Sequence, residues 1–352
     1  MVSVLPPISD AQVIPVNDHI GLWDAWPIQK HDGNPAVLAD GSELWMALVA
    51  PRCDADPDAR HHHARIHLLQ RRGQQWEHLG PAMPDGFSPG SREWSGSAVL
   101  RPADMTVTLY FTATGRRGEA ATSFEQRMFE AVATLVDTGG RPALVDWRGL
   151  REIVALDPQH YMPTGGIEGE VGKIKAFRDP GYFLDPVSGH EHLLFAGSIA
   201  RSQSAYNGAV GLARRSGSST WELCPPLISA DTFNNELERP HVLRHAGLYY
   251  LFWSTQRHVF NPDGAQGPTG LYGMVSSHLL EGWKPLNGTG LVFANPELAP
   301  AQAYSWLVLP DLSVASFVDN WGGGATRRFG GSFAPFVRIG LSGDRAWLQG
   351  LA

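Results

Sequence analysis

TVTLYFTAT, residues 106 to 114, is the clearest of the segments that decide the fold of this chain. It is rich in β-branched and aromatic residues and is closed by a glycine, which is the composition of a β-strand. Long amphipathic helices are nearly absent from the sequence. Six further runs have the same character: LWMALVA (44–50), ARIHLLQ (64–70), HLLFAGSIA (192–200), LYYLFWST (248–255), LYGMVSS (271–277) and SVASFVD (313–319). We therefore predict an all-β protein.

The spread of these strands limits the possible architectures. The chain has 352 residues, and its 39 glycines and 26 prolines are scattered, with no Ser-rich or charge-rich linker. We therefore predict one domain over residues 1–352, with residues 1–20 as an N-terminal extension. Many short strands in one long domain are typical of a propeller, a sandwich or a large barrel, and their even spread favours the propeller. No clean sequence repeat accompanies this pattern.

Composition excludes several classes of protein. The net charge is -7, with 18% charged and 43% hydrophobic residues, which argues against disorder and fibres. No Lys/Arg block suggests a nucleic acid or an anionic membrane as partner, so a neutral ligand suits the chain better. The N-terminus lacks the pattern of a signal peptide, and no apolar run approaches the roughly 20 residues that span a bilayer. Cys53 and Cys224 are too few for a disulfide framework, and we expect free thiols.

Three short motifs each set a carboxylate among residues that can fix its rotamer and shift its pKa. They are Asp24 in LWDAWP (22–27), Asp179 in FRDPGYF (177–183) and Glu238 in ELERPH (236–241). A retaining glycosidase needs one ionised carboxylate as nucleophile and one carboxylic acid as proton donor, about 5 Å apart. Each motif alone also has a structural explanation, respectively a buried turn cap, an Asp-Pro turn with a local ion pair, and a solvated strand edge.

The last motif carries the proton donor. Glu236 and Glu238 alternate along an extended stretch and therefore project to one face. Like charges held close push one pKa upward, as a general acid requires, and we expect Arg239 to balance the surplus charge. In EWSGSA (93–98), a tryptophan that can stack on a sugar precedes a hydroxyl.

Other polar segments indicate no separate site. RHHHARIH (60–67) is rich in histidine, but it adjoins an Asp/Pro loop, and we interpret it as a polar strand entry rather than a metal site. NPDGAQGPTG (261–270) lacks the alternating carboxylates of a calcium loop. No Ser-His-Asp arrangement is evident.

In this order, the motifs resemble those of glycoside hydrolase family 68, the levansucrase and inulosucrase group. The resemblance runs from about Gly21 to Gly322 and includes GPTGLYGMVS (267–276) and GLVFANP (290–296). It implies a five-bladed β-propeller that cleaves sucrose without a cofactor, passes fructose to water, sucrose or short fructans, and acts outside the cell.

The resemblance also implies roles for individual residues. Asp24 would be the nucleophile, Asp179 the stabiliser of the transition state and Glu238 the acid/base. The residues that would shape the sucrose pocket are Trp23, Trp94, Ser95, Arg178, Glu236 and Tyr304, with Gln256 on the acceptor side.

The chain departs from the family pattern at three places. Relatives often carry His or Arg where this chain has Gln256, which predicts hydrolysis and short products rather than polymer. Trp306, where some relatives have His, would offer a stacking surface that partly compensates. Asn235 and Lys173 stand where calcium-binding relatives have Asp, so we predict no structural calcium.

Two alternatives to a sucrose-cleaving enzyme remain. One is an arabinofuranoside-active glycosidase of a related five-bladed family, and the other is a non-catalytic carbohydrate-binding propeller. The three carboxylates argue against the second alternative, because a binding protein needs no nucleophile and acid together.

Overall fold

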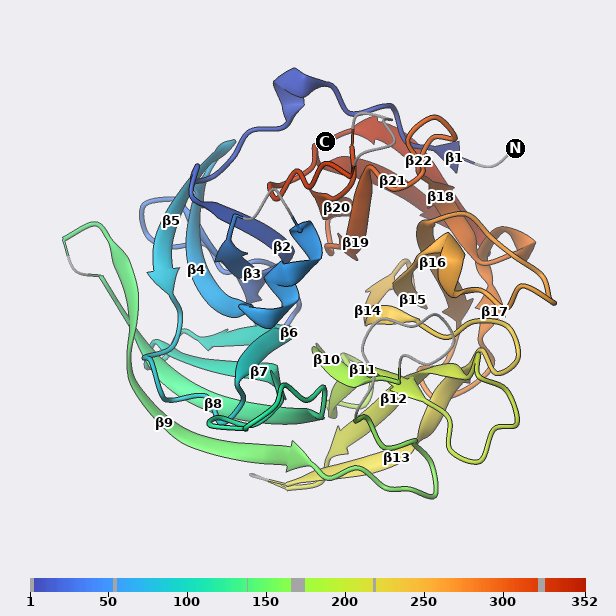
Figure 1. Cartoon of the computed structure of the whole chain (residues 1–352), viewed down its shortest axis with the longest axis horizontal. Coiled ribbons are helices and arrows are strands. Elements are labelled where there is room, and N and C mark those ends of the chain that lie inside the picture. The colour runs from blue at the N-terminus through green and yellow to red at the C-terminus, as the bar shows by residue number, and fades with distance from the viewer. Residues whose placement is uncertain (1–2, 53–55, 138, 166–174, 218–219, 322–326) are drawn as a thin grey trace.

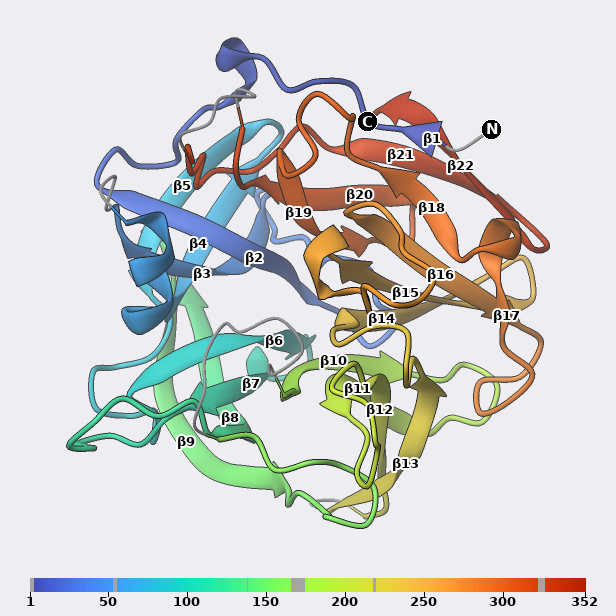
Figure 2. The ribbon, with the colours of Figure 1, turned by 45° about the vertical axis from the view of Figure 1, so that its right-hand side comes forward.

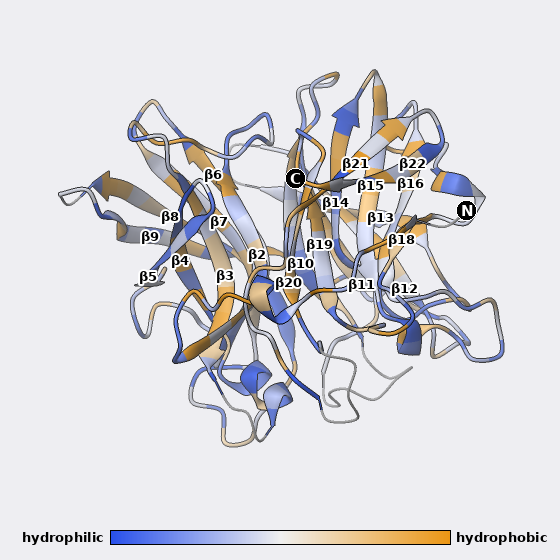
Figure 3. Ribbon diagram, turned by 90° about the horizontal axis from the view of Figure 1, so that it is seen from above, coloured by the Kyte–Doolittle hydropathy of each residue, from blue (hydrophilic) through white to orange (hydrophobic). Residues whose placement is uncertain are grey.

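A computed structural model describes residues 3–52, 56–137, 139–165, 175–217, 220–321 and 327–352. Five four-stranded antiparallel sheets stand around a central axis like the blades of a propeller (Figure 1). The prediction of an all-β, five-bladed β-propeller is therefore confirmed. Apolar residues concentrate in the strands, whereas many of the connecting loops are hydrophilic (Figure 3).

Each blade runs outward from the axis. Blade one holds β2 (Ile20–Gln29), β3 (Glu43–Pro51), β4 (Arg65–Arg72) and β5 (Gln75–Pro81). Blade two holds β6 (Arg92–Arg101), β7 (Thr106–Thr114), β8 (Gln126–Asp137) and β9 (Pro142–Val154). Blade three holds β10 (Phe177–Leu184), β11 (Glu191–Ser198), β12 (Gly208–Arg215) and β13 (Trp221–Ser229).

The remaining two blades follow the same plan. Blade four holds β14 (Glu238–His245), β15 (Leu248–Thr255), β16 (Gly270–Ser276) and β18 (Leu291–Ala294), with β17 (Lys284–Pro285) paired to β16. Blade five holds β19 (Ala303–Val308), β20 (Ser313–Val318), β21 (Val337–Ser342) and β22 (Arg345–Leu351). The short 3-10 helices of the described chain are η1 (Asp10–Gln12), η2 (Pro57–His62), η3 (Arg257–Val259) and η4 (Leu286–Gly288).

The innermost strands β2, β6, β10, β14 and β19 gather around the axis (Figures 1 and 2). The ends of β2 and β6 pair in parallel at Ile28 with Ala98 and at Gln29 with Val99, so blades one and two share one sheet. Apolar side chains pack between the blades and exclude water from this ring. The inner strands therefore hold their polar residues in fixed positions near the axis.

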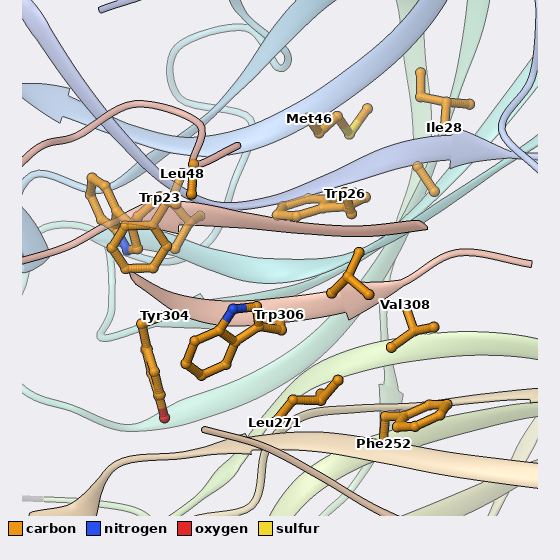
Figure 4. Packing of buried hydrophobic residues seen from close by; sticks show 14 of the residues in the cluster. Trp23, Trp26, Ile28, Met46, Leu48, Phe252, Leu271, Tyr304, Trp306 and Val308 are labelled. Atoms are coloured by element: carbon orange, nitrogen blue, oxygen red, sulfur yellow. The ribbon is translucent and has the colours of Figure 1, made fainter. Parts of the chain in front are cut away.

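Trp306 belongs to this core. It is 1% exposed and packs edge-on against Phe293 and Tyr304, at ring-centroid distances of 5.6 and 5.8 Å (Figure 4). The prediction that Trp306 offers a stacking surface to a sugar is therefore wrong, because no face of the ring is available.

The N-terminal segment straps the outside of the ring. β1 (Ser3–Val4) pairs in parallel with β18 of blade four, at Ser3 with Phe293. The Gln302 side chain donates to the Pro6 carbonyl over 2.9 Å. Blade one closes against blade five through a 3.0 Å hydrogen bond from Leu22 N to the Gly331 carbonyl. Cys224 is a free thiol, whereas Cys53 lies outside the described residues.

Candidate active site

A β-bulge recurs near one end of every inner strand. The register breaks immediately follow Trp23, Trp94, Arg178, Glu238 and Tyr304. The next residue has a positive φ in four of the five strands: Asp24 (49°), Asp179 (64°), Arg239 (48°) and Ser305 (59°). A bulge bends the strand and re-aims its side chains, and it is common beside active sites. The repeat that the sequence did not reveal therefore exists as a repeated backbone distortion.

These bulges surround a cavity of about 980 Å³. Its walls include nine of the ten predicted site residues, namely Trp23, Asp24, Trp94, Arg178, Asp179, Glu236, Glu238, Gln256 and Tyr304. The tenth, Ser95, lies directly behind Asp179, and its Oγ donates to Asp179 Oδ1 over 2.6 Å. Five separate blades thus bring the residues of the three motifs to one place.

Arg178 is the cation at the centre of the acidic residues. Its Nη2 donates to Glu236 Oε1 at 2.6 Å and to Glu238 Oε1 at 2.7 Å, and its Nε lies 3.5 Å from Asp179 Oδ2. The expectation that Arg239 balances the Glu236 and Glu238 charges is therefore wrong. Arg178 reaches them because β10 and β14 are neighbouring inner strands, a contact that sequence order does not reveal.

Arg239 instead serves Asp24. Its Nη1 donates to Ser305 Oγ over 2.8 Å and its Nη2 to the Ala25 carbonyl over 2.9 Å. Burial raises the pKa of Asp24, while the Arg239 charge and the Ser305 hydroxyl oppose that shift. The Glu238 charge adds to the rise, which places the two carboxyls within electrostatic reach of each other.

Asp179 is locked in position by blade two. Besides the Ser95 hydrogen bond, its backbone N–H donates to Thr112 Oγ1 over 2.9 Å. Asp179 is 7% exposed, and burial raises its pKa to about 6 despite the Arg178 charge. A carboxylate held this rigidly is suited to binding hydroxyl groups at fixed positions.

Glu236 is the buried member of the glutamate pair. Its backbone is fixed at both ends, because its N–H donates to Asn234 Oδ1 at 2.6 Å and its carbonyl accepts from Thr255 Oγ1 at 2.8 Å. Burial, followed by the charge of Glu238, raises the pKa of Glu236 to about 7. The expected upward shift within the pair therefore falls on Glu236.

Several buried polar atoms of the cavity have no hydrogen-bond partner in the described chain. They are the indole nitrogens of Trp23 and Trp94, Nη1 of Arg178 and the Tyr304 hydroxyl. Burial and the nearby carboxylates hold the pKa of Tyr304 well above its usual range, so the hydroxyl keeps its proton. Unpaired buried donors in a native cavity call for a ligand. A polyhydroxylated molecule offers the matching acceptors.

The sequence interpretation of RHHHARIH missed part of this site. The segment does not simply enter a strand, since its first three residues end the helix η2, and Arg60, His61 and His62 line the cavity. His61 stands edge-on to Trp23 with ring centroids 5.6 Å apart. Arg60, Arg239 and Ser305 gain their positions from contacts between distant blades, so no local signal in the sequence marks them.

A lysine occupies the region where a calcium ion was considered. Lys175 Nζ donates to the Ala205 carbonyl at 2.7 Å and to Asn207 Oδ1 at 2.5 Å, and lies 3.4 Å from Asn235 Oδ1. The residues that the structure describes contain no cluster of three or more His, Cys, Asp or Glu able to hold a metal. Lys173 lies outside the described residues, so the absence of calcium stays a prediction.

The family model described as Levansucrase/Invertase matches residues 4–208 and 200–351. This chain belongs to glycoside hydrolase family 68. Among individual family members, it is 30% identical to levansucrase LscA of Pseudomonas savastanoi pv. glycinea, with 95% of this chain and 87% of that protein covered. The match confirms the resemblance seen in the sequence motifs.

Solved structures of family members share the architecture. The inulosucrase from Halalkalicoccus jeotgali bound to kestose superposes with a TM-score of 0.90 at 34% identity, covering 99% of this chain and 92% of that chain. The full-length β-fructofuranosidase from Microbacterium saccharophilum K-1 gives 0.86 at 25% identity, covering 100% and 79%. The family member described here is therefore a glycoside hydrolase and fructosyltransferase that acts on sucrose.

Proposed function

We propose that Asp24 is the nucleophile, Glu238 the acid/base and Asp179 the stabiliser of the transition state in a retaining cleavage of sucrose. The observation that carries this proposal is the convergence of three carboxylates from β2, β10 and β14 on one cavity, with Arg178 bound to the Glu236 and Glu238 carboxylates. Asp24 has its own cation in Arg239. These separate environments suit a base and an acid in one site.

In the first half-reaction, Glu238 gives its proton to the oxygen that joins glucose to fructose. The bond between that oxygen and the fructosyl anomeric carbon breaks, glucose leaves, and a carboxylate oxygen of Asp24 bonds to the same carbon. Positive charge develops on the fructosyl ring in between. The carboxylate of Asp179 is placed to stabilise that charge and to bind the ring hydroxyls.

In the second half-reaction, the Glu238 carboxylate takes a proton from the acceptor. The acceptor oxygen then displaces Asp24 from the anomeric carbon, and the configuration of the sugar is retained. Water as acceptor gives free fructose, whereas a hydroxyl of sucrose or of a short fructan gives a longer sugar. Both outcomes share one fructosyl-enzyme, so the acceptor geometry decides between them.

The wider setting is also part of the proposal. We infer that residues 1–352 act as one catalytic domain, with residues 1–20 as an extension that braces blades four and five. Family membership is the basis for proposing that the enzyme works outside the cell. Among the described residues, no helix has the length and apolar character needed to cross a membrane.

The direct experiment is to incubate the protein with sucrose and to measure glucose and fructose separately. We expect glucose to appear at least as fast as fructose, because transfer consumes fructose but never glucose. A parallel incubation with an aryl arabinofuranoside tests the alternative activity. Cleavage of the arabinoside without cleavage of sucrose would contradict the proposal, and turnover of neither would favour a binding protein.

A further inference from the structure

Two arginines and two aspartates form a closed charge network in the cavity wall between blades one and five. Arg60 Nη1 lies 3.0 Å from Asp58 Oδ1, and its Nη2 lies 4.0 Å from Asp319 Oδ1. Arg327 Nη2 lies 3.2 Å from the same Asp319 oxygen, and its Nη1 pairs with Asp58. All four residues line the cavity that contains Asp24 and Glu238.

The network is buried more deeply than a surface ion pair. The side chains of Arg60 and Asp319 are each 8% exposed, and the Arg60 guanidinium lies 4.3 Å from the centroid of the Phe329 ring. Removing such charges from water costs more than an ion pair alone returns, which makes the network weak evidence for stability. A use in binding explains its position better.

Part of its hydrogen-bonding capacity is unused. The Nε atoms of Arg60 and Arg327 are buried and have no partner in the described chain. Leaving a buried donor unpaired costs about 1–3 kcal/mol, so a bound ligand that supplies an acceptor is favoured. Asp319 meets both arginines through Oδ1, which leaves Oδ2 to accept hydrogen bonds.

The charges indicate the chemistry of that ligand. Two guanidinium groups and two carboxylates cancel, so the network does not attract an anion or a cation strongly. It instead presents donors and acceptors side by side, which matches the adjacent hydroxyls of a neutral sugar. His61 extends this wall, and burial together with the Arg60 charge lowers its pKa well below the usual range. A neutral imidazole both donates and accepts.

The position of the network relative to Glu238 indicates which sugar it meets. Glu238, Arg327 and Asp319 all lie close enough to His258, beside η3, for their charges to influence its pKa. Glu238 is the proposed donor of the proton to the leaving oxygen. The sugar beyond that oxygen must therefore extend toward the side where Arg327 and Asp319 lie.

We propose that Asp58, Arg60, Asp319 and Arg327 form the subsite for the sugar on the acceptor side of the scissile bond. They would hold the glucosyl group of sucrose before cleavage and the incoming acceptor sugar after it. This subsite rests on the proposed roles of Asp24 and Glu238. It also supplies a guanidinium at the acceptor side, where Gln256 provides no charge.

The test compares Arg327→Met and Asp319→Asn with the wild type, and uses Arg328→Met as a matched control. Arg328 is the adjacent arginine, is exposed, and packs on Trp321 at 4.2 Å. We expect the KM for sucrose to rise about tenfold in the first two variants, the usual effect of losing a hydrogen bond to a charged group. The control should match the wild type.

A second readout is the partition of the fructosyl-enzyme between water and sugar acceptors, obtained from the ratio of free fructose to free glucose. This ratio does not depend on the amount of folded enzyme, so a purely structural role would not change it. We expect transfer to fall in Asp319→Asn and Arg327→Met. Unchanged KM and partition in both variants, or equal changes in Arg328→Met, would overturn the subsite. A wild type that releases no glucose from sucrose would instead refute the proposed function.

Discussion

At the scale of single residues, the site depends on side chains held in an unusual backbone conformation. Asp24, Asp179 and Arg239 all have positive φ, which costs about 1–3 kcal/mol for a residue with a side chain. The surrounding blades impose this conformation. Such strain is typical of functional positions, where orientation matters more than local stability.

The first prediction concerns Asp24. Asp24→Asn should lower sucrose cleavage by a factor of about 10⁴ or more, because an amide cannot form the covalent intermediate. The initial rate of glucose release measures the effect, and circular dichroism checks the fold. Asp18→Asn, at an exposed aspartate, is the control. A folded Asp24→Asn protein with wild-type turnover would show that another group is the nucleophile.

The second prediction concerns Gln256, which lines the cavity beside η3. Gln256 can hydrogen-bond an acceptor but lacks the charge and the bidentate geometry of Arg. The wild type should therefore favour hydrolysis and short transfer products, and Gln256→Arg or Gln256→His should lengthen them. Sizing the products made from sucrose is the measurement. Abundant high-molecular-weight fructan from the wild type, or no change in either variant, would mean that elongation is governed elsewhere.

At the scale of elements, the sequence predicts the middle strands of the blades best. The run 106–114 coincides with β7 and the run 248–255 with β15, because strands buried on both faces are continuously apolar. β13 and β22 escaped prediction, since outer strands are largely exposed and carry polar residues. The bulged inner strands were visible only as acidic motifs, because a bulge interrupts the regular alternation of a strand.

A third prediction concerns Glu93, which joins β6 to the strand beside it. Its Oε2 accepts from the Ile66 N–H at 2.8 Å, and burial raises its pKa from 4.5 to about 7. Between these values the folded protein keeps a proton that the unfolded chain has lost. Stability contributed by Glu93 therefore falls as pH rises from about 5 to 8, by about 2 kcal/mol.

Urea unfolding of the wild type and of Glu93→Gln at pH 5 and pH 8 measures this contribution. The variant should lose less stability than the wild type over this interval, and the difference between the two proteins isolates Glu93 from other titrating groups. Glu297→Gln, at an exposed position, should behave like the wild type. Equal pH dependence in wild type and Glu93→Gln would show that the carboxyl titrates normally.

A fourth prediction concerns Lys175, which links the loop before β12 to Asn235 before β14. Lys175→Met should lower the free energy of unfolding by about 2 kcal/mol, as expected for hydrogen bonds to a charged group. Lys284→Met, at an exposed lysine, is the control in denaturant unfolding. EDTA should change neither stability nor activity, because an ammonium already occupies this cluster of oxygens. A loss of activity that calcium restores would reveal a metal site.

At the scale of the whole molecule, the sequence alone favours a propeller but does not supply the number of blades, which came from the family resemblance. The blades diverge so far that their common feature is a bulge rather than a residue pattern. The motif residues were predictable because each lies in a short, chemically unusual segment. Their partners were not, since Arg178 meets Glu236, and Arg60 meets Asp319, only when distant blades close into a ring.

The central claim, that Asp24 and Glu238 share one retaining site, is tested most directly by trapping the covalent intermediate. Glu238→Gln is incubated with β-fructofuranosyl fluoride, whose leaving group needs no proton, and digested for mass spectrometry. We predict one fructosyl unit on the peptide that contains Asp24, because the deglycosylation step lacks its base. Release of fluoride with the fructosyl unit on another peptide, or with no labelled peptide, would contradict this mechanism.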